Sequence, residues 1–305
     1  MRIERRLALL RLVLSHPLNR GRPFRTVSRY VGWQAWRRLV GRPLTIDFWQ
    51  GLKVRVHPDW PYSWTALYLG LAEFDDMTFA VRYLRPGDAF VDVGANIGYY
   101  SLLASRVNAG SPVLALEPHP IASERLAENA VMNSFDNIRV RAVAAGEAEG
   151  FADLTAGLAD QNHITPSGPG TDPTIRVPMV TLDAELGRQQ IDLASVALVK
   201  IDTEGFETSV LAGSRALLDC DPGPVWVVEV NGSGARYGTE DSALIRIFLQ
   251  RGYEAFRYLA LENRIIPYDG SIAWQGNVIF ARRLGQIRAR LGVGTSSLRG
   301  VDSIA

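Results

Sequence analysis

The sequence predicts an α/β fold: a doubly wound, mostly parallel sheet with an antiparallel edge hairpin and a helical N-terminal extension. From residue 88 onward, short apolar runs alternate with helical segments of about a dozen residues, which is the pattern of βαβ units. Apolar residues make up 47% of the 305 residues and charged residues 21%, so the chain can bury a sizeable core.

Residues 1–45 are expected to form a basic helical extension. Apolar residues at helical spacing over 3–16 and 25–40 predict two short amphipathic helices. Residues 1–42 hold eleven arginines and one acid, Glu4. Such a segment is suited to contact with a membrane surface or an acidic partner; the alternative is a solvated cap on the domain. Nucleic acid is not expected as a partner, because the rest of the chain is net acidic.

Residues 46–283 are expected to form the main domain. It opens with a hairpin around Gln50-Gly51 and an aromatic-rich stretch over 60–68. Buried strands are then predicted at 89–94, 112–118, 137–145, 196–202 and 224–230. Helices are predicted at 74–84, 97–107, 121–133, 204–218 and 241–252.

Three further segments complete the prediction. Residues 151–174 are rich in Gly, Pro and small polar residues, and we expect an exposed loop or weak hairpin over the site. The runs at 253–260 and 276–283 predict the edge hairpin. Residues 284–305 are expected to be a flexible tail.

The single cysteine, Cys220, excludes an intramolecular disulfide and suits a reducing compartment. The N-terminal apolar run is broken by Arg11, and we expect no signal peptide. No apolar stretch reaches the roughly 18 to 20 residues that cross a bilayer. A cytoplasmic protein is expected, with peripheral contact to a membrane as the alternative.

The segment VDVGANIG, residues 91–98, carries the first chemical signal. The strand ends at Asp92, and glycines at 94 and 98 turn the chain into a helix whose free amides favour a ligand. The spacing is D-x-G-x-x-x-G and differs from the G-x-G-x-x-G of dinucleotide-binding proteins, so a pyrophosphate ligand is disfavoured. Glu117 ends the next strand, where a carboxylate can accept hydrogen bonds from both hydroxyls of an unphosphorylated ribose.

Together, VDVGANIGYYS, ALEPHP, AENAVMN and VKIDTEGFETSVLAG resemble the FkbM family of S-adenosylmethionine-dependent methyltransferases over roughly residues 68–282. The resemblance implies a Rossmann-like class I methyltransferase that methylates a hydroxyl of a sugar, glycolipid or secondary metabolite. It places Asp92, Gly94, Ala95, Asn96 and Gly98 around the methionine part of S-adenosyl-L-methionine and Glu117 at the ribose. Glu73 matches an acid that the family places before the first strand, and Ala144 completes the expected cofactor contacts.

Lys200 and Asp202 follow the fourth buried strand, where ligands bind in open α/β sheets. Asp202 is the candidate base or orienting group for a hydroxyl acceptor, and Lys200 would steady its charge or a developing alkoxide. The alternative is a structural ion pair. For Glu204 we favour capping of the following helix.

Other candidates are weaker. His163, in the polar loop, is a possible general base, although such a histidine is more often solvated. Glu229 and Asn231 could join Asp202 in a magnesium site, which we do not favour. The aromatic residues Trp60, Tyr62, Trp64 and Tyr68 pack in the core or contact the acceptor.

Two other functions stay open. A nicotinamide-dependent oxidoreductase uses the same topology, and the glycine spacing counts against it. The other is a non-catalytic nucleoside-binding module that is docked by the basic N-terminus.

Overall fold

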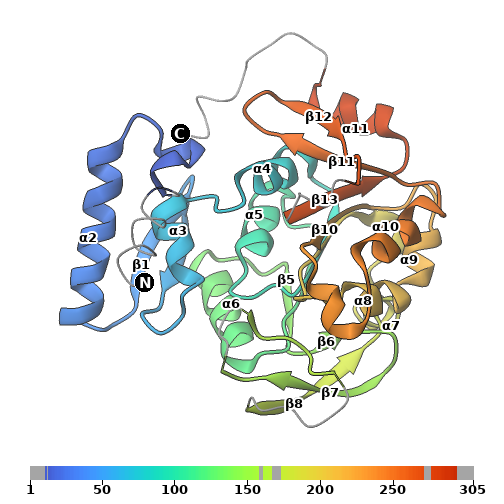
Figure 1. Ribbon diagram of the computed structural model, residues 1–305, viewed down its shortest axis with the longest axis horizontal. Coiled ribbons are helices and arrows are strands. Elements are labelled where there is room, and N and C mark those ends of the chain that lie inside the picture. Colours follow the sequence, from blue (N-terminus) through green and yellow to red (C-terminus); the bar gives the residue numbers. More distant parts are fainter. Residues whose placement is uncertain (1–10, 12, 158–160, 167–172, 271–275, 294–305) are drawn as a thin grey trace.

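The computed structural model describes residues 11, 13–157, 161–166, 173–270 and 276–293. At its centre is an eight-stranded sheet in the order β12-β11-β13-β10-β9-β3-β4-β5 (Figure 1). Its strands are β3 (Ala89–Val93), β4 (Val113–Leu116), β5 (Ile138–Arg141), β9 (Val196–Ile201), β10 (Val225–Val230), β11 (Glu254–Leu259), β12 (Arg264–Pro267) and β13 (Gly276–Ala281). The strands from β10 to β5 are parallel and β13, β11 and β12 pair antiparallel, which confirms the mostly parallel sheet with an antiparallel edge.

Helices cover both faces of this sheet (Figure 1). One face carries α4 (Phe74–Tyr83), α5 (Tyr99–Val107) and α6 (Pro120–Met132). The other carries α7 (Leu182–Arg188), α8 (Glu207–Ala212), α9 (Arg215–Asp219) and α10 (Asp241–Leu249). Along β3, Phe90 packs with the first group, whereas Val91 packs with the second. This alternation confirms the doubly wound fold, since successive side chains of a strand point to opposite faces.

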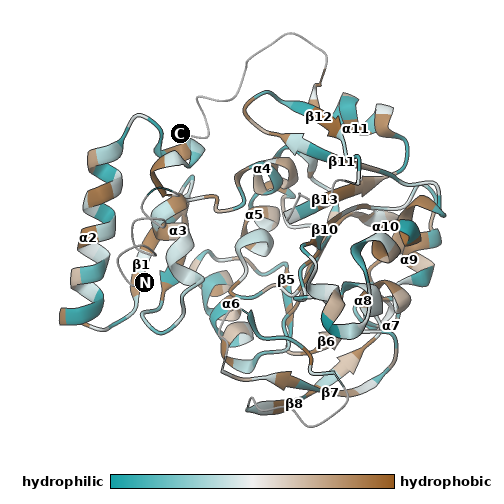
Figure 2. Ribbon diagram, in the orientation of Figure 1, coloured by the Kyte–Doolittle hydropathy of each residue, from teal (hydrophilic) through white to brown (hydrophobic). Residues whose placement is uncertain are grey.

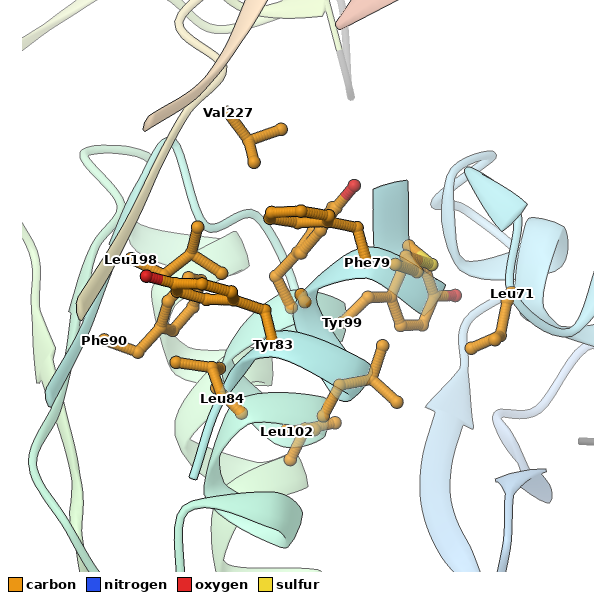
Figure 3. Close-up of a cluster of buried hydrophobic side chains, with 14 of the residues drawn as sticks. Leu71, Phe79, Tyr83, Leu84, Phe90, Tyr99, Leu102, Leu198 and Val227 are labelled. Carbon is orange, nitrogen blue, oxygen red and sulfur yellow. The ribbon is translucent and has the colours of Figure 1, made fainter. Parts of the chain in front are cut away.

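The core beneath α4 is aromatic (Figure 3). Phe79 and Tyr83, one helical turn apart, stack with ring centroids 5.4 Å apart and an interplanar angle of 7°. They cover Phe90, Leu198 and Val227 from three neighbouring strands. Full burial of one such side chain stabilises the fold by about 1.5–3 kcal/mol.

The N-terminal elements are η1 (Pro17–Asn19), α2 (Pro23–Leu39), the hairpin β1 (Leu44–Trp49) and β2 (Leu52–Val56), and α3 (Ser63–Leu69). They confirm the hairpin and the second predicted helix. The predicted helix over 3–16 lies mostly outside the described residues; of its C-terminal part, residues 11 and 13–15 are helical. The backbone amide of Arg55 donates to Asn129 of α6 at 2.9 Å, and that of Lys53 donates to Asn133, the residue that follows α6, at 2.8 Å. These bonds fix the hairpin to the central sheet's helical layer.

A small second sheet, in the order β6-β8-β7, adjoins the polar segment. Its strands are β6 (Ala144–Ala145), β7 (Gly150–Thr155) and β8 (Thr174–Val180). β7 and β8 pair antiparallel, so the hairpin alternative for residues 151–174 is confirmed at its two ends.

Two predictions were wrong in detail. Over 284–291 the predicted flexible tail is a helix, α11 (Leu284–Leu291), because Ile287 and Leu291 are buried against the core; residues 294–305 lie outside the described part. The predicted helix over 204–218 is two short helices that break at Gly213, where a Cβ would lie 2.0 Å from the carbonyl oxygen of Gly146.

Two short 3-10 helices, η3 (Leu193–Ser195) and η4 (Ser233–Tyr237), connect other elements. In the described part of the chain, no helix is both long and apolar enough to span a bilayer.

Candidate functional site

A cavity of about 200 Å³ lies at the carboxyl ends of β3, β4 and β9. In the sheet order, β4 and β5 lie on one side of β3, and β9 and β10 on the other. Open α/β sheets bind ligands at such a switch point. The cavity is lined by ten of the residues predicted from the sequence: Glu73, Asp92, Gly94, Ala95, Asn96, Glu117, Ala144, His163, Lys200 and Asp202.

Gly98, the remaining residue of the predicted cofactor-binding and catalytic set, does not line the cavity but ends the turn at the start of α5. Its φ is +92°, and a Cβ there would lie 2.7 Å from Leu126 Cγ. Gly94 has φ +80°, and a Cβ on it would lie 1.7 Å from the carbonyl oxygen of Asp202. The ends of β3 and β9 therefore touch through backbone alone, and only glycine fits at position 94.

Glu117 ends β4 and is buried. Its carboxylate accepts hydrogen bonds from the backbone amides of Asn96 and His119, both at 2.8 Å. These bonds join the glycine turn to the second strand. Burial raises the pKa of Glu117 to about 7 despite the two amide donors.

Asp92 and Lys200 are direct neighbours in the β3–β9 register, so both side chains stand on one side of the sheet. Asp92 accepts a hydrogen bond from Ser101 Oγ at 2.6 Å, and burial raises its pKa to about 6. Lys200 is 1% exposed, and its Nζ donates to Asp202 Oδ2 at 3.1 Å. Burial disfavours the ammonium, but the charges of Asp202, Glu73 and Glu229 outweigh it and raise the pKa of Lys200.

A hydrogen-bond network behind Lys200 was not predicted from the sequence. Lys200 Nζ donates to Asn277 Oδ1 at 2.8 Å, and Asn277 Nδ2 donates to Glu73 Oε2 at 2.7 Å and Asp76 Oδ2 at 2.9 Å. The hydroxyl of Tyr100 also donates to Glu73 Oε2, at 2.8 Å. Burial raises the pKa of Asp76 to about 7. Glu73 thus does more than begin α4, because its carboxylate is held in the network.

The signal for Asn277 was present in the sequence. It is an amide in the otherwise apolar run GNVIFA, and a buried polar side chain requires hydrogen-bond partners. Nothing in the sequence indicated which side chains those partners are.

The segment between β7 and β8 brings His163 to the cavity. The backbone amide of His163 donates to Thr155 Oγ1, and its carbonyl accepts from the amide of Thr155, both at 3.0 Å. Its Nδ1 lies 3.1 Å from the carbonyl oxygen of Gln161. The loop therefore reaches the site as expected, and a catalytic role for His163 stays a prediction.

Three carboxyl groups meet beside Asp202. Oxygen atoms of Asp202, Glu204 and Glu229 lie within 4.8 Å of one another. Burial, followed by the charge of Asp202, raises the pKa of Glu229 to about 9. Asn231, grouped with Asp202 and Glu229 in the sequence, is not among the residues that line the cavity, and its Oδ1 accepts from the amide of Ser233 at 2.9 Å.

The expected helix cap at Glu204 is wrong. Glu204 has φ +56°, and the carboxylate that accepts from the turn amides of Thr203 and Gly205 is Glu207, at 2.9 and 3.1 Å. Glu204 lines the cavity instead.

The aromatic stretch divides between two surroundings. Trp60 and Tyr62 line the cavity, and Trp60 Nε1 donates to Asn96 Oδ1 at 3.0 Å. Trp64 and Tyr68 pack toward α2 in a small apolar cluster. Packing is therefore confirmed for Trp64 and Tyr68, whereas contact of Trp60 or Tyr62 with an acceptor stays a prediction.

The sheet order, with a pocket at the carboxyl edge of β3, β4 and β9, defines a Rossmann-like α/β protein of the class I methyltransferase type. The family model described as the methyltransferase FkbM domain matches residues 92–255. This chain belongs to that family.

Curated relatives agree. The chain is 31% identical over 160 residues to the 31-O-demethyl-FK506 methyltransferase FkbM of Streptomyces tacrolimicus, which is 43% of this chain and 60% of that protein. It is also 27% identical over 148 residues to methyltransferase 1 of Beauveria bassiana. That match covers 42% of this chain and 59% of the B. bassiana protein. The chain thus spans about 60% of the length of these relatives.

Similar solved structures include an rRNA methylase from Streptococcus thermophilus, at 11% identity and a TM-score of 0.40 over 68% of this chain and 93% of that one. Another is an O-methyltransferase from Bacillus cereus in complex with S-adenosylhomocysteine, at 15% identity and a TM-score of 0.37. That match covers 68% of this chain and 80% of the B. cereus chain.

Proposed function

We propose that this chain transfers the methyl group of S-adenosylmethionine to a hydroxyl oxygen of a sugar, glycolipid or secondary metabolite. The observation that carries the proposal is the charge of the cavity lining. Among the described residues that line it are six carboxylic acids, one lysine and no arginine. The acids are Glu73, Asp92, Glu117, Asp202, Glu204 and Glu229.

Crowded, buried carboxyl groups favour a cationic ligand over an anionic one, because each negative charge is poorly solvated. S-adenosylmethionine carries a sulfonium and an ammonium group, whereas nicotinamide dinucleotides carry a pyrophosphate. The same charge argument disfavours the oxidoreductase alternative, in agreement with the glycine spacing.

This chain's residues fit the parts of that cofactor. The carboxylate of Glu117 can accept hydrogen bonds from the two ribose hydroxyls, and the turn residues Gly94, Ala95 and Asn96 line the same cavity. Asp92 lies beside them on the neighbouring strand. When bound, the cofactor supplies the electrophilic methyl group.

Asp202 is the group that faces the acceptor in this proposal. Its side chain is 29% exposed, whereas that of its partner Lys200 is 2% exposed. Asp202 orients the hydroxyl and takes its proton, while the hydroxyl oxygen bonds to the methyl carbon and the carbon–sulfur electron pair leaves with sulfur. The S. tacrolimicus relative, whose name specifies a 31-O position, supports an oxygen acceptor.

Isothermal titration of the purified protein with S-adenosylhomocysteine tests the cofactor, with NADH as the control ligand. We expect micromolar binding of the first and none of the second. Binding of NADH alone would overturn the proposal. Transfer of label from methyl-labelled S-adenosylmethionine to hydroxylated acceptors then tests the reaction, and turnover only on amine or thiol acceptors would refute the oxygen assignment.

A further inference from the structure

Helix α2 presents an apolar stripe to solvent. At 100° per residue, Phe24, Val27, Val31, Ala35 and Leu39 fall within an arc of about 120°, which also contains Ser28 and Arg38. All five are exposed, Phe24 to 91%, Leu39 to 85% and Val31 to 58%. Figure 1 shows α2 at the margin of the molecule, and Figure 2 shows hydrophobic and hydrophilic residues interleaved along it.

The opposite face of α2 is fixed to the domain. Thr26 and Trp33 are buried, and the Trp33 ring lies 6.2 Å from the ring of Trp64. Tyr30 contacts the ring of Tyr68 at 5.4 Å. The helix is therefore held with its apolar stripe outward, and the stripe is a property of the folded protein.

The surroundings of the stripe are strongly basic. Between residues 16 and 46 the sequence has no acid and seven arginines: Arg20, Arg22, Arg25, Arg29, Arg37, Arg38 and Arg42. In the part of the chain that the structure describes, none of the seven forms an ion pair. Arg25 and Arg38 are exposed on α2 itself.

We infer that this face of α2 docks on the surface of a membrane containing anionic phospholipid. An exposed apolar stripe with exposed arginines suits a helix that lies in the interface plane, with its apolar side among the acyl chains and its cations at the headgroups. Arg25 lies beside the stripe, whereas Arg38 lies within it and reaches the headgroups by extending its long side chain. A nucleic acid would match the arginines and leave Phe24, Val31 and Leu39 without an apolar partner. A second copy of this chain would bring two arginine-rich faces together.

The docked face is structurally connected to the proposed site. α2 packs on α3, and the segment just before α3 supplies Trp60 and Tyr62 to the cavity. The inference itself does not depend on the proposed methyl transfer, because binding is measured without cofactor or acceptor.

The test is flotation of the full chain with vesicles of phosphatidylcholine, with or without about 30 mol % phosphatidylglycerol. We expect binding to the anionic vesicles alone, weakened by added salt. Arg25→Gln with Arg38→Gln lowers the affinity about twentyfold, at about fivefold for each cation. Phe24→Ser with Leu39→Ser lowers it about tenfold or more.

Matched controls are available at exposed positions on other helices. Arg106→Gln with Arg246→Gln removes two exposed arginines elsewhere, and Val131→Ser with Leu249→Ser removes two exposed apolar side chains. Both controls should bind like the parent chain, and all four double variants should keep its melting temperature.

Three outcomes overturn the inference. The first is absence of vesicle binding, or binding that neither test variant reduces. The second is binding of duplex DNA or RNA that the arginine variant weakens and the serine variant does not, which assigns the face to nucleic acid. The third is a dimer that the serine variant converts to monomer without any vesicle binding.

Discussion

Gly94→Ala tests the contact on which the site is built. The added Cβ would lie 1.7 Å from the carbonyl oxygen of Asp202, whereas ordinary van der Waals contact begins at 3.4 Å. The ends of β3 and β9 would have to separate by about 1.7 Å, the difference between these two distances. Overpacking of this kind costs about 1–3 kcal/mol, and the left-handed φ of +80° adds about 1–2 kcal/mol.

Gly110→Ala is the matched control. Gly110 has φ +85° and no heavy atom within 4 Å of an added Cβ, so the control carries the backbone strain without the contact. Thermal unfolding should therefore place Gly94→Ala below Gly110→Ala by about 2–12 °C, from about 1–3 kcal/mol of overpacking at about 2–4 °C per kcal/mol.

Titration with S-adenosylhomocysteine provides the second measurement. We expect at least about a tenfold loss of affinity in Gly94→Ala and none in Gly110→Ala, because only the first displaces the turn beside Asp202. Equal melting temperatures and equal affinities in the two variants would refute the argument that β3 and β9 meet through backbone at this position.

Three further predictions concern the carboxyl groups. Asp202→Asn should lower kcat/KM by about 10²–10⁴-fold and change the affinity for S-adenosylhomocysteine only a few-fold, and equal loss of both would contradict an acceptor-facing role. The pKa of Glu117 is raised to about 7, and ribose hydroxyls donate to its ionised form. The affinity for S-adenosylhomocysteine should therefore rise as the pH rises through about 7. Glu117→Gln should bind S-adenosylhomocysteine weakly and without that pH dependence, as titration at several pH values would show. The pKa of Asp76 is also raised to about 7, so the free energy of unfolding falls as pH rises from the ordinary aspartate pKa through that value. Asp76→Asn should therefore raise the free energy of unfolding at pH 8 by about 1–4 kcal/mol, and with it the melting temperature. An unchanged or lower melting temperature would count against this explanation.

The carboxyl edge of the sheet could be predicted because parallel strands end together. Once βαβ units were recognised, Asp92, Glu117 and Asp202 followed as neighbours, whatever the lengths of the intervening helices. Their role as candidate site residues needed only the local sequence around each strand end.

The network behind Lys200 could not be predicted in the same way. Asn277 reaches Lys200 because β13 inserts antiparallel between β10 and β11, an arrangement set by long-range pairing. The break between α8 and α9 also depends on a distant backbone, since Gly213 packs on Gly146. Local propensity contains neither contact.

The burial of Lys200, which lies within β9, distinguishes it from Asp202, which follows that strand. An isolated buried lysine loses its proton readily, but here the carboxylates of Asp202, Glu73 and Glu229 raise its pKa and favour the ammonium form. Its side chain is 2% exposed, and its Nζ donates to Asp202 and Asn277, whereas the side chain of Asp202 is 29% exposed. In the proposed reaction, we therefore expect Lys200 to act mainly by positioning Asp202, which is the more open of the two to an acceptor.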